Sequence, residues 1–128
     1  MSPVRPSRDQ SDILFVEDIR FFGHHGVTAA QQEVGAWFSV DVELALDLTP
    51  AALSDDVEAT VDYGGVVRRV VALATEQRVR LIERLAGLLT EALLREFPVR
   101  EVTVRVRKLT APLGGIAAVP GVQMKRTR

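Results

Sequence analysis

Apolar and polar residues alternate in two stretches near the start of the chain, with the period of two that is typical of β-strands. Between residues 13 and 22, one parity carries Ile13, Phe15, Ile19 and Phe21. The second stretch is more regular, with an apolar side of Phe38, Val40, Val42, Leu44, Leu46 and Leu48 and a polar side of Ser39, Asp41, Glu43 and Asp47. This alternation predicts two strands that each bury one face, as in antiparallel sheets.

The middle of the chain changes to a helical period. A first apolar stripe consists of Val66, Val67, Val70, Val71 and Ala74. A second helix is predicted to begin near Leu81 and to end near Phe97, because Pro98 cannot continue it. Its apolar arc consists of Leu81, Ile82, Leu85, Ala86, Leu88, Leu89, Ala92 and Leu93. Period two then returns in Val102, Val104 and Val106, and again in Val122 and Met124.

The order of elements is therefore strand, strand, helix, helix, strand, strand. It predicts an α+β fold in which a four-stranded antiparallel sheet carries both helices on one face. Residues 12–128 are expected to form a single domain, and residues 1–11 a disordered leader. A connection of about ten residues separates the first two strands, which is long for a hairpin and suggests a functional loop.

The second strand is long and has few features that would protect a sheet edge. A single subunit is therefore expected to expose an open edge, which closure of several sheets around a symmetry axis would remove. The sequence thus predicts a homo-oligomeric barrel.

Composition limits the possible functions. The chain has 128 residues, a net charge of −1 and no cysteine. Its length fits one domain, and its charge provides no field that would attract nucleic acid or an anionic membrane. The lack of cysteine excludes thiolate metal sites and thiol nucleophiles. No apolar run suits a membrane span or a secretory signal, so a cytoplasmic location is expected.

Three polar residues stand out as candidates for chemistry. Glu83 lies at the start of the second helix, Tyr63 closes an acidic segment, and Lys108 continues the apolar parity of Val106 at a strand end. A carboxylate, a phenol and an amine can together hold a polar heterocycle and move protons around it. Each also has a simpler explanation. Glu83 is then a first-turn glutamate favoured by the helix dipole, Tyr63 a half-buried aromatic residue, and Lys108 a solvated lysine at a strand end.

Several short motifs together resemble the dihydroneopterin aldolase family. In chain order they are Gly23-His24-His25-Gly26-Val27, Gly35 with Phe38-Ser39-Val40-Asp41-Val42, Ser54-Asp55-Asp56 with Thr60-Val61-Asp62-Tyr63, Leu81-Ile82-Glu83-Arg84-Leu85-Ala86, and Lys108 with Ala111-Pro112. The resemblance extends from about residue 12 to residue 126. It implies the tunnelling fold, rings of four subunits that stack into octamers, and active sites between neighbouring subunits. It also implies retro-aldol cleavage of dihydroneopterin in folate biosynthesis.

The resemblance further implies a role for each site residue. Lys108 is the acid-base group, and Tyr63 donates a proton across the subunit boundary. Glu83 anchors the pterin through two parallel hydrogen bonds, and the substrate-binding residues also include Ile82, Val61 and Gln31. A dihydropterin contains a conjugated imine that can accept the electrons released by the cleaved bond, so no cofactor, Schiff base or metal is expected. His24 and His25 are adjacent and have no third ligand at a suitable spacing, so no metal site is expected.

The chain also departs from the family pattern. Gln31 stands where the family has a glutamate, and Leu109 follows Lys108 where the family usually has proline, as can occur in dihydroneopterin triphosphate epimerases. Arg80 occupies a position that is often small and polar. These departures leave two alternatives to an aldolase: an epimerase acting on dihydroneopterin or its triphosphate, and a catalytically weakened pterin-binding paralogue.

Overall fold

The computed structural model describes residues 12–128, and the expected leader, residues 1–11, lies outside the described residues. The elements are β1 (Ile13–Gly23), α1 (Ala29–Val34), β2 (Ala36–Ala45), α2 (Thr49–Ser54), the 3-10 helix η1 (Val57–Ala59), α3 (Tyr63–Glu76), α4 (Ile82–Glu96), β3 (Glu101–Lys108) and β4 (Gly121–Thr127). The predicted order of strands and long helices is confirmed. Three short helical segments, α1, α2 and η1, were not predicted, and α1 lies within the connection expected to be a loop.

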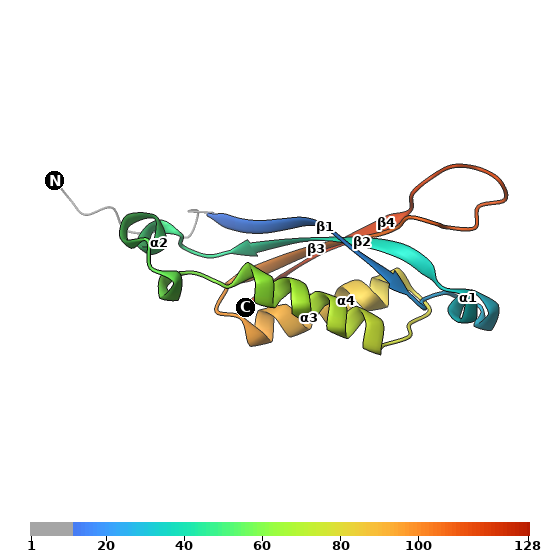
Figure 1. Ribbon diagram of the computed structural model, residues 1–128, viewed down its shortest axis with the longest axis horizontal. Helices are drawn as coiled ribbons and strands as arrows, with labels where there is room; N and C mark the ends of the chain where they lie inside the picture. Colours follow the sequence, from blue (N-terminus) through green and yellow to red (C-terminus); the bar gives the residue numbers. More distant parts are fainter. Residues whose placement is uncertain (1–11) are drawn as a thin grey trace.

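The four strands form one antiparallel sheet in the order β1-β2-β3-β4. Both long helices cover the same face of this sheet, and the opposite face is open (Figure 1). The order corrects one sequence-based argument: β2 lies between β1 and β3, so it is not the exposed edge. The unpaired edges belong to β1 and β4, and any closure of the sheet into a barrel would have to pair these two strands.

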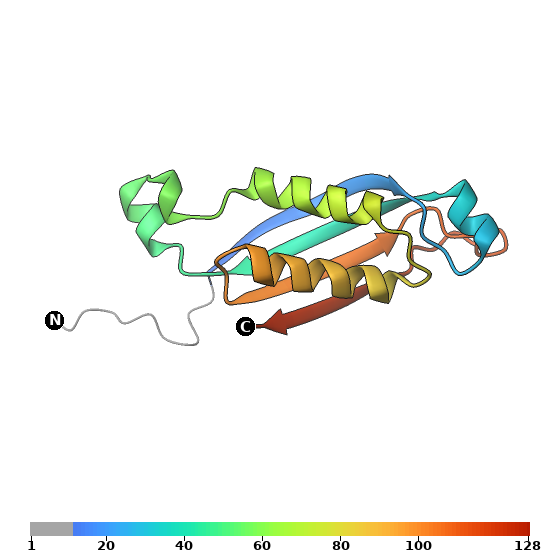
Figure 2. The same ribbon diagram turned by 90° about the horizontal axis from the view of Figure 1, so that it is seen from below.

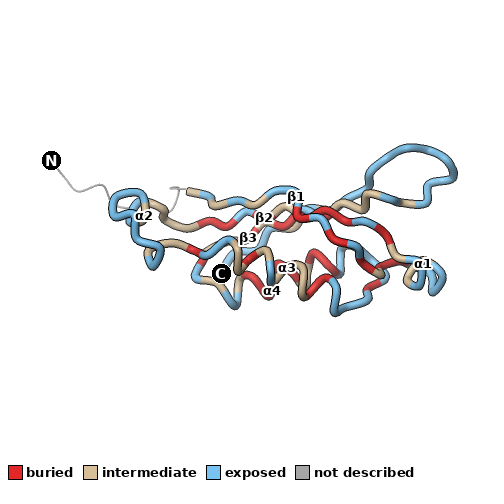
Figure 3. The backbone as a smooth tube through the Cα atoms, viewed as in Figure 1, coloured by how far each residue is buried: buried red, intermediate tan, exposed pale blue. Residues whose placement is uncertain are grey.

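The core lies between the sheet and the two helices, as the buried positions in Figure 3 indicate. The predicted apolar positions that lie within the two central strands are fully buried: Phe38, Val40, Val42, Leu44, Val102, Val104 and Val106. Leu46 and Leu48, predicted on the same strand, lie beyond the end of β2 and are half-buried. From the helices, the buried strand residues meet Val66, Val70, Leu85, Leu89 and Leu93, which are also fully buried. Burial of each such side chain contributes about 1.5–3 kcal/mol of transfer free energy. This packing fixes the end of β3, where Lys108 lies, and the start of α4, where Glu83 lies.

The single parity predicted for the first strand is wrong in its first half. The register of β1 against β2 shifts between Val16 and Ile19, which marks a β-bulge. Before the bulge, Leu14 packs against the core, whereas Ile13 and Phe15 are 40% and 61% exposed. One extra residue in a strand moves every preceding side chain to the opposite face.

Side chains on the open face hold the bulge in place. Asp18 adopts a φ of 58° there, and its backbone N–H donates to Asp41 Oδ1 at 2.8 Å. Ser39 Oγ and Arg20 Nε donate to the Asp18 carboxylate at 2.6 and 2.9 Å, and Arg107 donates to Asp41 Oδ2 at 2.7 Å. The hydrogen bond from Arg107 lowers the pKa of Asp41, and that from Arg20 lowers the pKa of Asp18. Both carboxylates therefore stay ionised at neutral pH.

Candidate functional site

Lys108 ends β3 on the same side as the buried valines of that strand, as its parity predicted. Its side chain is half-buried, with Nζ 3.5 Å from the carbonyl oxygen of His25 and 5.8 Å from the centre of the Phe38 ring. The ion pairs of the described residues do not include Lys108. The geometry thus presents a half-buried amine that is not neutralised by a neighbouring carboxylate, so it is available to a ligand.

A cavity of about 270 Å³ lies beside Lys108. Its wall is formed by α1, the start of β2 and the segment after β3: Ala30, Gln31, Val34, Gly35, Ala36, Lys108, Thr110 and Pro112. The structure therefore brings together Lys108 and Gln31, two of the residues proposed from sequence. Ligand pockets for compounds of drug size commonly measure roughly 300–1,000 Å³. The cavity is slightly smaller than this range.

Gln31 also has a local structural task. Its Oε1 accepts the backbone N–H groups of Val27 at 2.9 Å and Thr28 at 3.3 Å, while Thr28 Oγ1 accepts the N–H of Gln31 at 3.1 Å. This reciprocal capping box starts α1. Glu33 is the acidic residue of α1 nearest in sequence to Gln31. It is exposed and lies two positions along the same helix, so it does not share the face of Gln31 on the cavity wall.

His25 is a site residue that the sequence analysis did not identify. It is 1% exposed, its Nδ1 accepts the backbone N–H of Val79 at 3.1 Å, and its Nε2 lies 2.8 Å from the carbonyl oxygen of Ala74. Since Nδ1 accepts, Nε2 carries the proton and donates, which fixes the neutral tautomer. Burial lowers the pKa of His25. Adjacent histidines in a glycine-rich loop indicated only a connection, and no sequence signal showed which ring would be buried.

Glu83 and Ile82 begin α4 at the same end of the molecule as Lys108. Figure 2 shows the start of α4, the end of β3 and α1 at this end. The backbone N–H of Gly26 donates to the carbonyl of Val79 at 3.0 Å, so the connection before α4 is tied to the loop that follows β1. Ile82 is half-buried against the core, whereas Glu83 is exposed in the first turn. The exposed carboxylate is thus free to bind a ligand, and the helix dipole favours its charge.

Tyr63 and Val61 lie at the opposite end of the molecule. Tyr63 is the first residue of α3 and is 65% exposed, while Val61 is 3% exposed and belongs to the core. The other end of α3 reaches His25 through the carbonyl of Ala74. The eleven-residue step from Tyr63 to Ala74 corresponds to about 17 Å of helix at 1.5 Å per residue. Within one chain, the fold therefore does not bring Tyr63 to Lys108.

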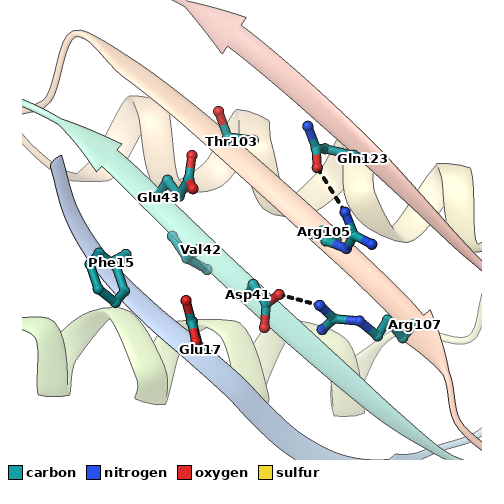
Figure 4. Close-up of a pocket in the computed structure, with 9 residues that line it drawn as sticks. All are labelled: Phe15, Glu17, Asp41, Val42, Glu43, Thr103, Arg105, Arg107 and Gln123. Carbon is teal, nitrogen blue, oxygen red and sulfur yellow. Dashed lines mark hydrogen bonds and ion pairs between the residues drawn. The ribbon is translucent and has the colours of Figure 1, made fainter. Parts of the chain in front are cut away.

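A second hollow, of about 200 Å³, lies on the open face of the sheet (Figure 4). Charged side chains of three strands dominate its wall: Glu17 from β1, Asp41 and Glu43 from β2, and Arg105 and Arg107 from β3. The carboxylate of Asp41 is already bonded to Arg107, and Arg105 donates to Gln123 at 3.3 Å. This hollow contains none of the site residues proposed from sequence.

The described part of the chain, residues 12–128, offers no cluster of three or more His, Asp or Glu side chains suited to a metal ion. In the same part, no helix combines the length and the hydropathy needed to cross a membrane.

The fold places the chain in a class of small α+β proteins with known structures. One of these is the crystal structure of the Escherichia coli dihydroneopterin aldolase in complex with neopterin, which aligns with a TM-score of 0.82 and 31% identity over 90% of this chain and 98% of that chain. Curated relatives give the same family. The dihydroneopterin aldolase of Streptococcus pyogenes serotype M18 is 39% identical over 118 residues, which cover 91% of this chain and 99% of the relative. That of Staphylococcus epidermidis is 38% identical over 117 residues, covering 91% and 97%.

A family model described as dihydroneopterin aldolase (FolB) matches residues 14–125. The chain belongs to the dihydroneopterin aldolase family, and the resemblance noted from its motifs is confirmed.

Proposed function

We propose that this protein cleaves 7,8-dihydroneopterin by a retro-aldol reaction, giving 6-hydroxymethyl-7,8-dihydropterin and glycolaldehyde. The observation that carries the proposal is the half-buried Lys108 amine on a cavity wall, at the end of the molecule where Glu83 exposes its carboxylate. Family membership, with the E. coli relative bound to neopterin, supports a pterin as the ligand.

In this proposal, Glu83 holds the ring nitrogen and the amino group of the pterin through two parallel hydrogen bonds. Ile82 lies beside it at the helix start. Lys108 takes the proton from the side-chain hydroxyl next to the bond to be cleaved. As that C–O–H becomes an aldehyde, the carbon–carbon bond breaks and its electron pair moves into the conjugated imine of the ring. Because the substrate itself accepts these electrons, the reaction needs neither a Schiff base nor a metal.

The electron pair must then return to the side-chain carbon together with a proton. A phenol suits this step because its proton is available at neutral pH. Tyr63 lies about 17 Å along α3 from the helix end that contacts the Lys108 region, so we propose that a second copy of the chain supplies it. The side chain of Val61 is buried in the core, so its contribution to substrate binding would come from its backbone.

Assembly would complete this site. We propose pairing of the free β1 and β4 edges of neighbouring copies, in rings of four that stack into octamers. Light scattering that returns a monomer mass at micromolar concentration would contradict this. A cytoplasmic location is proposed as well, as expected from the sequence.

One observation favours epimerisation of a phosphorylated pterin as a second candidate function. Arg80 Nε donates to the carbonyl of Val27 at 3.2 Å, which holds the guanidinium beside the loop that carries His25. Its position suits contact with phosphate groups on an extended substrate side chain. Re-addition of the released aldehyde after retro-aldol cleavage would epimerise the same carbon.

Product analysis separates the candidates. Purified protein is incubated with dihydroneopterin or with its triphosphate, and the products are resolved by chromatography. The proposal expects hydroxymethyl-dihydropterin from dihydroneopterin. Exclusive formation of a stereoisomer, from the triphosphate in particular, would favour the epimerase. Binding without any product from either compound would identify a pterin-binding paralogue.

A further inference from the structure

His25 connects three segments that carry or support the proposed site. Through Nε2 it donates to the carbonyl of Ala74, near the end of α3. Through Nδ1 it accepts the N–H of Val79, four residues before Glu83. Its own carbonyl oxygen is the hydrogen-bond acceptor of Lys108 Nζ. The residue is almost completely buried, so these bonds are shielded from water.

We infer that His25 is a positioning residue that sets the Lys108 amine relative to the pterin held by Glu83. The inference rests on the proposed function, because it assigns His25 a task in that reaction. The imidazole ring fixes the loop whose carbonyl receives Lys108, and the same ring fixes the connection that leads into α4. A displacement of reacting groups by about 1 Å can lower a rate by about a hundredfold.

The His25 ring and the Lys108 amine also contact a common aromatic side chain, Phe38. The His25 ring lies edge-on to Phe38, with centroids 5.2 Å apart, and Lys108 Nζ lies over the same Phe38 ring at 5.8 Å. Phe38 is fully buried in β2 and pairs with Lys108 in the sheet register. The imidazole and the amine therefore both contact the same buried ring, which adds to the hydrogen bond between His25 and Lys108.

The protonation state of His25 should make the reaction rate depend on pH, an effect that a purely structural role of the ring in packing would not give. Protonated imidazole has two donors, so it would lose the acceptor that binds the Val79 N–H. His24 and Lys108 are the charged or titratable groups that face the ring, and both disfavour a second positive charge there. With burial as the largest cause, the pKa of His25 lies below its ordinary value of 6.5. The neutral form therefore persists through neutral pH and is lost only on acidification.

Two isosteric substitutions separate the roles of the ring nitrogens. In His25→Asn, the amide oxygen replaces Nδ1 and can still accept the Val79 N–H. In His25→Gln, the amide nitrogen replaces Nε2 and can still donate to the Ala74 carbonyl. His25→Leu removes both bonds. A matched control is Val70→Ala, which weakens the packing of α3 at a fully buried position in the middle of the helix.

The experiment measures kcat, KM and product affinity for dihydroneopterin between pH 5 and pH 8. We expect His25→Leu to lower kcat about a hundredfold and to weaken affinity for the pterin product much less, because the Glu83 side chain is still present. His25→Asn should retain more activity than His25→Gln, since it keeps the link to the segment that carries Glu83. The parent's kcat should fall at acid pH as His25 is protonated. His25→Asn should not show this fall, because an amide does not titrate. Val70→Ala should lower stability and leave kcat near the parent value.

The outcomes separate this inference from the proposed function. A parent enzyme that releases no glycolaldehyde overturns both. An active parent whose His25 variants keep normal kcat, or lose it only as far as Val70→Ala does, overturns the positioning role and leaves the aldolase function standing. A fall in kcat at acid pH that survives unchanged in His25→Asn also overturns it.

Discussion

Two defective variants of this protein should restore each other's activity when they assemble together. Tyr63 begins α3, whereas Lys108, at the end of β3, bonds to His25 beside Ala74, about 17 Å further along the same helix. If both act in the same reaction, each site must take Lys108 from one copy and Tyr63 from another. Lys108→Ala and Tyr63→Phe should each lower kcat about a hundredfold or more, as is typical for loss of an acid-base group.

The recovered activity follows from counting intact sites. In an equal, random mixture of the two variants, half of the copies carry a native Lys108 and the other half a native Tyr63. A site formed by two copies is then intact in about one case in four, so the mixture should reach about a quarter of the parent's activity per chain, whatever the size of a closed ring. A site formed within one chain would never be intact in this mixture.

The assay needs random mixed assemblies, which equal co-expression of the two variants with different affinity tags would provide. Activity is measured on the unselected mixture, and capture of one tag followed by detection of the other shows that the two variants assemble together. Dihydroneopterin turnover is compared with that of each variant purified alone. The matched control is an equal mixture of the parent with the double variant Lys108→Ala/Tyr63→Phe. Sites shared between copies predict about a quarter of the parent's activity for this control as well, whereas sites within one chain predict about half.

Activity of the mixed assembly that does not exceed the sum of the separate variants would refute the shared site. A half-active control mixture would refute it independently. In either case, the role of Tyr63 in proton transfer would have to be abandoned, because the fold keeps it away from Lys108 within one chain.

Three further expectations concern single residues. Glu83→Ala should abolish pterin binding in a fluorescence titration while Lys108→Ala retains it, because an anchor acts on the ground state and the transition state alike; unchanged affinity would remove the anchor role. Gln31→Glu should keep the capping box and raise kcat, because it adds a carboxylate to the cavity wall. The increase should be smaller than the roughly hundredfold effect of a direct acid-base group. An unchanged kcat would place Gln31 outside the chemistry. Asp41→Ala should lower the free energy of unfolding by about 1–2 kcal/mol at pH 7, since it removes charged hydrogen bonds to Arg107 and to the bulge. The pKa of Asp41 lies below its ordinary value of 3.8, so this stabilisation is present above that pH and is lost as the pH falls through the lowered value. The free energies of unfolding of the parent and the variant, measured by urea denaturation, should therefore converge at acid pH. A difference that persists there would contradict the argument.

Periodicity predicted the architecture because most of the core depends on regular alternation. The valines of β3 and the centres of the predicted arcs of α3 and α4 are buried as their spacing required, whereas Leu81, just before α4, is 50% exposed. The position of Lys108 followed from the same alternation, since it continues the buried parity to the end of the strand.

Two sequence-based predictions were wrong: the parity of the first strand, which a single extra residue changed, and the exposed edge of the sheet, which depends on which strands are neighbours. The bulge at Asp18 reversed the faces of Ile13 and Phe15, and no period could show it because the responsible contact comes from Asp41, on another strand. The edge argument failed because sequence describes one strand at a time, whereas an edge is a property of the order of strands in the sheet.

The motifs pointed to Glu83, Tyr63 and Lys108, and the resemblance assigned Tyr63 to the other side of a subunit boundary. The roles of these residues stay predictions, whereas the fold gives their arrangement within one chain, with Tyr63 at the far end of α3. His25 was missed because its importance comes from three contacts with residues far apart in the sequence, at Ala74, Val79 and Lys108.

Cleavage of dihydroneopterin in heavy water tests the central claim most directly. In a retro-aldol reaction, the electron pair of the broken carbon–carbon bond is finally protonated at the side-chain carbon, and in deuterium oxide this proton is a deuteron. Mass spectrometry and NMR should therefore find one non-exchangeable deuterium on the hydroxymethyl carbon of 6-hydroxymethyl-7,8-dihydropterin, with one equivalent of glycolaldehyde for each pterin product. Product formation no faster than without protein, or a hydroxymethyl carbon without deuterium, would contradict the proposed reaction.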